Sequence, residues 1–198
     1  DSGVEGASRF LRRLYALVHD HVSAGPVPVP CAGELDEAGV GLRRKLHETI
    51  AKVSDDIGRR YTFNTAIAAV MELCNALGRY PADTRAARGL HQEALEAVVL
   101  MLQPITPHLS HGLWNALGRD GAAVDQPWPV VDEAALVRDE VELVVQVNGK
   151  LRSRIAVRAD AGEDSIREQA LEDANVQRFI DGKTVRKVIV VPGRLVNV

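Results

Sequence analysis

Several features are scarce in this chain of 198 residues, and each scarcity narrows the class of protein. There are only two cysteines, Cys31 and Cys74, without Cys-x-x-Cys spacing, so we expect thiols in a reducing compartment rather than a disulfide framework. No window approaches the roughly 20 apolar residues of a membrane-spanning helix. No signal-like apolar run stands at the N-terminus. Aromatic residues make up 4% of the chain, so any core must be built mainly from Leu, Val, Ile and Ala.

Recognisable patterns for catalysis, metal binding and phosphate binding are also missing. The sequence holds neither a Gly-x-Gly-x-x-Gly string nor a Walker-type loop. His108 and His111 stand three residues apart, but no third ligand follows at a matching spacing, so we expect capping, packing or exposure. Ser110 beside His111 is no triad, because adjacent side chains on a helix point apart. We therefore predict no catalytic residue, no metal and no cofactor in this chain.

The charge of the chain is small and unevenly spread. The net charge of −3 argues against indiscriminate binding to nucleic acid. Residues 1–137 hold 13 Lys and Arg against 17 Asp and Glu, whereas residues 138–198 hold 11 against 10. Any contact with RNA must therefore use local patches of Lys and Arg, as in a discriminating binder.

The first 120 residues show the three- and four-residue spacing of amphipathic helices. The proline-rich segment 25–30 ends the first of them. Thr106 and Pro107 supply an N-cap and a proline at the first helical position for the last. Helices joined by short turns predict an antiparallel bundle over residues 1–120. We expect these helices near residues 4–23, 36–59, 63–78, 84–102 and 107–117.

Beyond the bundle we expect a connector and a small second domain. The connector covers residues 121–137, and Trp128 between two prolines is predicted to hold it against the bundle. From Val141 the apolar period changes to two, which indicates strands and a small α/β domain over residues 138–198. The predicted fold class is therefore α+β, a mainly helical bundle followed by a small α/β domain with a β-hairpin. We expect strands near residues 141–147, 151–157, 184–191 and 195–197, a helix near 163–173 and a short turn or helix near 176–180.

The hairpin carries the first candidate site. Asn148-Gly149 is a strong signal for a tight turn, because both turn positions need positive φ. A row of fixed cations on the returning strand suits a phosphate backbone. Cations on an edge strand also serve to discourage pairing between sheets, and this alternative stays open. The period of two separates cations from apolar residues, with Lys150, Arg152 and Arg154 on one face and Leu151, Ile155 and Val157 on the other.

The terminal segment carries a second group of cations. Lys183, Lys187 and Arg194 would extend the same positive surface if strand 184–191 paired beside the hairpin. Arg186 shares its predicted strand face with valines, which favours packing over contact with RNA.

Several stretches resemble one enzyme family. Val145-Gln146-Val147-Asn148-Gly149-Lys150 and residues 181–197 resemble the start and the end of the C-terminal domain of bacterial leucyl-tRNA synthetases. Residues 47–77 also fit the leucyl enzymes. Residues 102–108, Leu-Gln-Pro-Ile-Thr-Pro-His, with Trp114 after them, are similar to a pattern in the helical anticodon-binding domain of class I synthetases for aliphatic amino acids.

The resemblance implies an ATP-dependent, Mg-requiring ligase of the cytoplasm that attaches leucine to its tRNA. Neither a His-Ile-Gly-His-like motif nor a Lys-Met-Ser-Lys-Ser-like loop occurs here. We therefore expect the C-terminal piece of a longer polypeptide, inactive by itself, whose partners are leucine tRNA and the catalytic core of the same polypeptide, with neither DNA nor a membrane. The family places such a bundle along the inner corner of the tRNA, which adds weaker candidates for tRNA contact: Arg12, Arg13, Arg43 and Arg60.

Two alternatives stay open. One is a free-standing RNA-binding module that reuses the bundle without catalysis. The other is a purely structural interaction domain that supports the enzyme without touching RNA.

Overall fold

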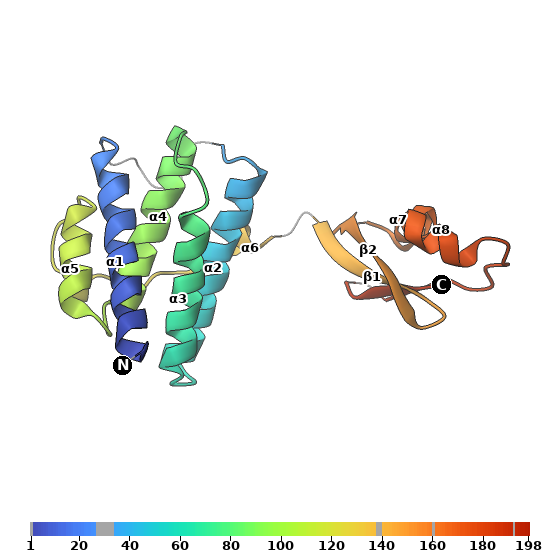
Figure 1. The fold of residues 1–198 in the computed structure, drawn as a ribbon. Helices are drawn as coiled ribbons and strands as arrows, with labels where there is room; N and C mark the ends of the chain where they lie inside the picture. Colours follow the sequence, from blue (N-terminus) through green and yellow to red (C-terminus); the bar gives the residue numbers. More distant parts are fainter. Residues whose placement is uncertain (1, 27–33, 138–139, 160, 192) are drawn as a thin grey trace. The chain divides into compact units, whose positions relative to one another are not determined.

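The computed structural model describes residues 2–26, 34–137, 140–159, 161–191 and 193–198 (Figure 1). The chain divides into two compact units, a helical unit, Asp1–Leu136, and a C-terminal unit, Val137–Val198. The helical unit is built from helices, and the C-terminal unit combines a sheet with two helices, so the predicted α+β class is confirmed.

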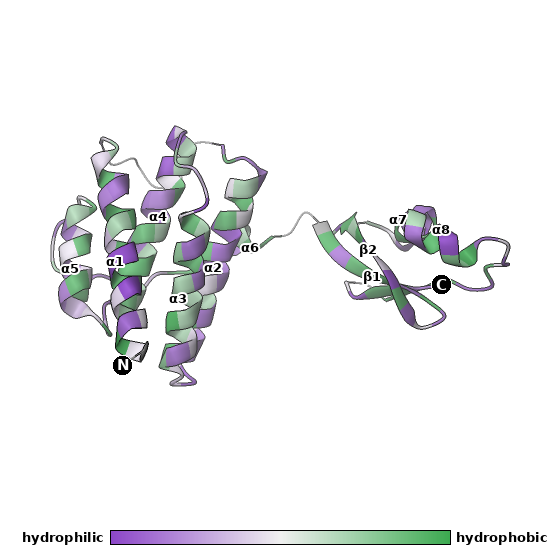
Figure 2. Ribbon diagram, viewed as in Figure 1, coloured by the Kyte–Doolittle hydropathy of each residue, from purple (hydrophilic) through white to green (hydrophobic). Residues whose placement is uncertain are grey.

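The long helices of the helical unit lie side by side, as the apolar spacing predicts (Figure 1). Hydrophilic and hydrophobic residues alternate along each of them in Figure 2, which is typical of helices with one buried side. Helix α5 begins with the predicted proline at its first turn. The elements are α1 (Ser2–Ser23), α2 (Glu37–Gly58), α3 (Phe63–Leu77), α4 (Arg85–Leu102), α5 (Pro107–Ala116), the 3-10 turn η1 (Ala123–Asp125) and α6 (Glu133–Leu136).

Helix caps and an aliphatic core hold this unit together. The side chain of Asp36 accepts a hydrogen bond from the backbone N–H of Gly39 at 2.7 Å and caps α2, and Thr84 caps α4 in the same way. Trp114 is 7% exposed, and its indole N–H donates to the carbonyl of Asp120 at 3.3 Å. The core is otherwise mostly aliphatic, as the shortage of aromatic residues requires; its fully buried members include Leu46, Leu73, Leu77, Leu90 and Leu117.

The segment after α5 packs on the bundle. Trp128 contacts the core, and its indole N–H donates to Ser54 Oγ at 2.7 Å, which confirms the predicted anchoring of this residue. Asp132 binds the guanidinium of Arg43 at 2.8 Å, and its backbone N–H donates to Nδ1 of His47 at 3.1 Å. These contacts fasten the end of the helical unit to α2.

The C-terminal unit is a four-stranded sheet of order β2-β1-β4-β3, packed against two helices. Strand β1 pairs with β2 antiparallel and with β4 parallel, and β3 pairs with β4 antiparallel. Residues from both helices, including Ile166 and Val176, join the core formed by the strands. The elements are β1 (Glu140–Val147), β2 (Lys150–Arg158), α7 (Glu163–Glu172), α8 (Ala174–Ile180), β3 (Ile189–Val191) and β4 (Leu195–Asn197).

The predicted strand over residues 184–191 is too long, and the condition that it pairs beside the hairpin is not met. Strand β3 covers Ile189–Val191 only, and β4 rather than β3 lies beside the hairpin. The pairing places Ile189 opposite Asn197, the last residue of β4, so residues 184–188 extend past that strand and have no ladder partner. These residues therefore run as an irregular segment from α8 to the sheet.

Candidate RNA interface

The hairpin turn is formed as the sequence predicts. Asn148 and Gly149 have φ values of 52° and 74°, the left-handed conformation that a tight primed turn requires. The turn is also fastened to β4, the strand next to β1, because the N–H of Gly149 donates to the side-chain carbonyl of Asn197 at 3.2 Å. The hairpin is thus a rigid support for the side chains around it.

The predicted row of three cations on one face of β2 is wrong. The pairing between β1 and β2 shifts between Val145 and Gln146, because Arg152 is an extra residue in β2. A one-residue bulge reverses the alternation, so Lys150 pairs with Val147, a residue of the buried face. Leu151, predicted to be buried, is 56% exposed for the same reason.

The three hairpin cations consequently have different surroundings. The guanidinium of Arg152 lies over the ring of Phe179 in α8, with its carbon 3.9 Å from the ring centroid. Arg154 keeps its outward position and forms an ion pair with Glu142 at 3.2 Å, so an acid offsets its charge. Lys150 is exposed beside the turn.

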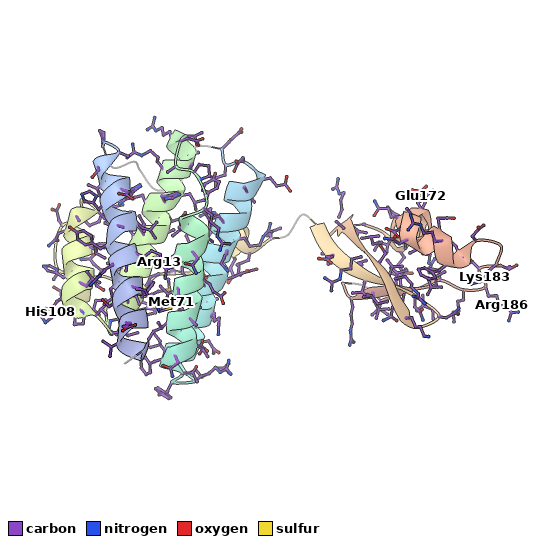
Figure 3. The ribbon with its side chains drawn as sticks, viewed as in Figure 1. Arg13, Met71, His108, Glu172, Lys183 and Arg186 are labelled. Carbon is purple, nitrogen blue, oxygen red and sulfur yellow. The ribbon has the colours of Figure 1, made fainter. Side chains whose placement is uncertain are left out.

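Cations gather instead around a groove between the hairpin turn and the segment after α8. This groove, of about 440 Å³, is called the basic groove here. Figure 3 shows Lys183 and Arg186 on the segment after α8, where both are exposed, and Lys183 Nζ also donates to the carbonyl of Phe179 at 2.9 Å. The polar, charged and aromatic residues that line the groove are Asn148, Phe179, Lys183, Thr184, Arg186, Lys187 and Asn197.

The groove places the three terminal cations differently from one another. Lys183 and Lys187 line the groove although strand 184–191 does not pair beside the hairpin, whereas Arg194 precedes β4 at the end opposite to Asn197 and does not line the groove. Arg186 is exposed in the irregular segment, so its predicted packing on a strand is wrong. Phe179 and Asn197 were missed, because only the folded chain brings α8 and β4 to the turn.

The weaker candidates for tRNA contact on the helices differ in whether their guanidinium groups already bind other side chains. Arg12 is exposed, and Arg13 donates to the side-chain carbonyl of Asn75 at 2.9 Å. The guanidinium of Arg43 binds Glu93 at 3.2 Å and Asp132 at 2.8 Å, an arrangement that favours a structural role.

The α2–α3 turn, residues 59–62, holds the last weak candidate, Arg60. The buried carboxylate of Asp56 lies beneath this turn and accepts hydrogen bonds from Lys52 at 2.7 Å and from Thr65 at 2.8 Å. These hydrogen bonds lower the pKa of Asp56 to about 2. Arg60 lies 3.6 Å from the same carboxylate with 59% of its side chain exposed.

The described cysteine and His111 have surroundings that indicate a role in packing or hydrogen bonding within the fold. Burial raises the pKa of the Cys74 thiol to about 12, so this cysteine is an inert core residue, whereas Cys31 lies outside the described residues. The ring of His111 contacts Asn115 Nδ2 at 3.3 Å and accepts the N–H of Ala123 at 3.4 Å. Within the described ranges, no three His, Cys, Asp or Glu side chains are grouped so as to hold a metal ion. Over the same ranges, no helix has the length and apolar character needed to cross a membrane.

Comparison with known proteins gives one consistent answer. Residues 41–167 match the family described as the anticodon-binding domain of tRNA ligase. The whole chain is 64% identical to part of a leucine–tRNA ligase of Alkalilimnicola ehrlichii and 65% identical to part of one of Thioalkalivibrio sulfidiphilus. It spans 23% and 24% of their lengths, about a quarter of the curated relatives that it matches.

A solved structure agrees with these relatives. The whole chain superposes on 25% of a chain in the ternary complex of Agrobacterium radiobacter K84 agnB2 LeuRS, tRNA and LeuAMS, with a TM-score of 0.81 and 26% identity. The family match covers well over half of this chain and includes most of the helical unit. The chain therefore belongs to the family of anticodon-binding domains of tRNA ligases, and it corresponds to the C-terminal quarter of leucine–tRNA ligases.

Proposed function

We propose that this chain is the part of a leucine–tRNA ligase that holds leucine tRNA while the remainder of the enzyme attaches leucine to it with ATP. The observation that carries the proposal is the basic groove, in which Lys183, Arg186 and Lys187 surround a cavity beside the aromatic ring of Phe179. The match to anticodon-binding domains and the likeness to a LeuRS solved together with tRNA support the same partner.

The groove suits the backbone of a folded RNA. Exposed ammonium and guanidinium groups neutralise phosphates and release the counterions bound to them, which favours association. Asn148 and Asn197 add amide groups that hydrogen-bond sugars and phosphates. Contacts of this kind position an RNA by its shape rather than by its base sequence. This mode fits a ligase whose tRNA substrates carry several different anticodons.

We place the chemistry of leucine attachment outside this chain. The sequence has no phosphate-cradling glycine loop, and ATP with Mg²⁺ would bind to the catalytic core of the complete ligase. The chain would contribute affinity for tRNA and orientation of its acceptor end. We place the ligase in the cytoplasm, together with translation.

Direct titration tests the proposal. The 198-residue chain is added to fluorescently labelled leucine tRNA at KCl concentrations between about 50 and 200 mM, and the binding constant is obtained from anisotropy. Three neutralised phosphates predict that log K falls with log salt at a slope of about −2 to −3. A folded chain that does not bind would support the structural interaction domain instead, and binding without salt dependence would contradict contacts to phosphates.

A further inference from the structure

The α2–α3 turn contains an exposed aromatic residue in a disfavoured conformation. Tyr61 has a φ of 55°, a left-handed value that side chains with a Cβ rarely adopt. Among the described residues, the only other non-glycine residue with positive φ is Asn148, which the hairpin turn requires. Tyr61 is also 74% exposed to solvent.

The turn is held from within, and the tyrosine ring takes no part in holding it. Asp56 accepts a hydrogen bond from the hydroxyl of Thr62 at 3.1 Å, and its backbone carbonyl accepts the N–H of Thr62 at 2.8 Å. No described residue forms a hydrogen bond with the Tyr61 hydroxyl. A glycine or asparagine would adopt this backbone conformation with less strain than a tyrosine. Backbone strain at a residue whose hydroxyl bonds to no described residue points to a role in binding a partner of the chain.

The neighbours of Tyr61 indicate the chemistry of its partner. Arg59 and Arg60 precede it, with 79% and 59% of their side chains exposed, and Phe63, 44% exposed, follows at the start of α3. Asp55 binds Arg59 at 2.6 Å and so holds this guanidinium beside the turn. Exposed rings interleaved with arginines match the surfaces on which nucleobases stack while cations contact the adjoining phosphates.

We propose that Tyr61 is a stacking platform for an unpaired base of the bound tRNA, forming a second contact separate from the basic groove. This inference rests on the proposed function, because it requires that the chain binds tRNA. The ring supplies a flat apolar surface for the base, and Arg60 lies within reach of its phosphate. Asp56 holds the backbone of the turn that carries the ring.

Substitutions at Tyr61 separate binding from folding. Tyr61→Gly and Tyr61→Asn remove the ring and relieve the backbone, so the melting temperature should stay the same or rise. Their affinity for leucine tRNA should fall by roughly five- to 150-fold, the range for loss of one stacked base. The salt dependence should keep its wild-type slope, because stacking releases no counterions. Tyr61→Phe retains the ring and should bind as the wild type does.

A matched control uses Tyr15, a tyrosine that is 57% exposed on helix α1. Tyr15→Ala should leave the affinity unchanged, and equal losses at both positions would overturn the assignment to Tyr61. A wild-type chain that binds with the expected salt slope, while Tyr61→Gly binds equally well, would overturn this inference and leave the proposed function intact. Failure of Tyr61→Phe to bind would show that the hydroxyl, not the ring, makes the contact. A folded wild-type chain that does not bind tRNA would overturn both.

Discussion

Removing two cations from the basic groove should change the salt dependence of tRNA binding by a predictable amount. The double variant is Lys183→Ala with Lys187→Ala. Both side chains are exposed, and the Lys183 ammonium donates a hydrogen bond to the backbone carbonyl of Phe179. Truncation therefore leaves no buried charge without a partner, and we expect the fold to be preserved.

The size of the effect follows from the number of phosphates released. Each neutralised phosphate contributes about 0.7 to 0.9 to the slope of log K against log salt, so two fewer contacts make the slope shallower by about 1.4 to 1.8. When the salt concentration rises fourfold, the fold-loss of tRNA affinity should be about 7 to 12 times smaller for the variant than for the wild type. At low salt the variant should bind more weakly.

The assay is the anisotropy titration with leucine tRNA at several KCl concentrations. A charge-matched control is Lys45→Ala with Arg178→Ala, which removes the same net charge at residues that do not line the groove. The control should keep the wild-type slope. An unchanged slope in the groove variant, or equal changes in both variants, would refute the assignment of phosphate contacts to the groove.

Three further predictions concern the fold that supports these contacts. Trp114→Ala should lower the free energy of unfolding in urea by about 3–5 kcal/mol, because the ring is buried in the bundle; a value near zero would contradict that position. The pKa of Asp56 in the folded chain, about 2, lies below its ordinary value of 3.8. Its ionised carboxylate therefore adds to the free energy of unfolding above pH 4, and this contribution is lost as the pH falls from about 4 to 2. Asp56→Asn should therefore melt at a lower temperature at neutral pH and lose that part of the acid dependence; an unchanged melting curve would contradict a stabilising role for the hydrogen bonds of Asp56 with Lys52 and Thr65. Gly149→Ala should destabilise the C-terminal unit by about 1–2 kcal/mol, measured by amide hydrogen exchange, because the φ of Gly149 is 74°. Amide protection equal to that of the wild type would contradict the left-handed conformation of the turn.

Local sequence signals predicted most of the fold. The helices follow from apolar spacing, and the start of α5 follows from Pro107, although the side chain of Thr106 forms no capping hydrogen bond. The hairpin follows from Asn148-Gly149, since few other pairs accept two positive φ values. In each case the determining interaction is confined to a few adjacent residues.

The candidate site was harder to predict, because its geometry depends on pairings between distant residues. A single extra residue, Arg152, reversed the faces of Lys150 and Leu151, and no residue type marks such a bulge in advance. The groove requires β4 to lie between β1 and β3, a topology that alternation alone does not specify. Tyr61 went unnoticed because its backbone conformation, rather than its residue type, distinguishes it.

Kinetics of a complete leucine–tRNA ligase, of which we propose this chain to be a part, separate tRNA binding from leucine chemistry. Lys183→Ala with Lys187→Ala is introduced, and two rates are measured: leucine activation by ATP without tRNA, and leucine attachment at increasing tRNA concentration. If this part holds the tRNA and the chemistry lies elsewhere, the KM for tRNA should rise while activation keeps its wild-type rate. Equal loss of activation and attachment in a well-folded variant would contradict the account.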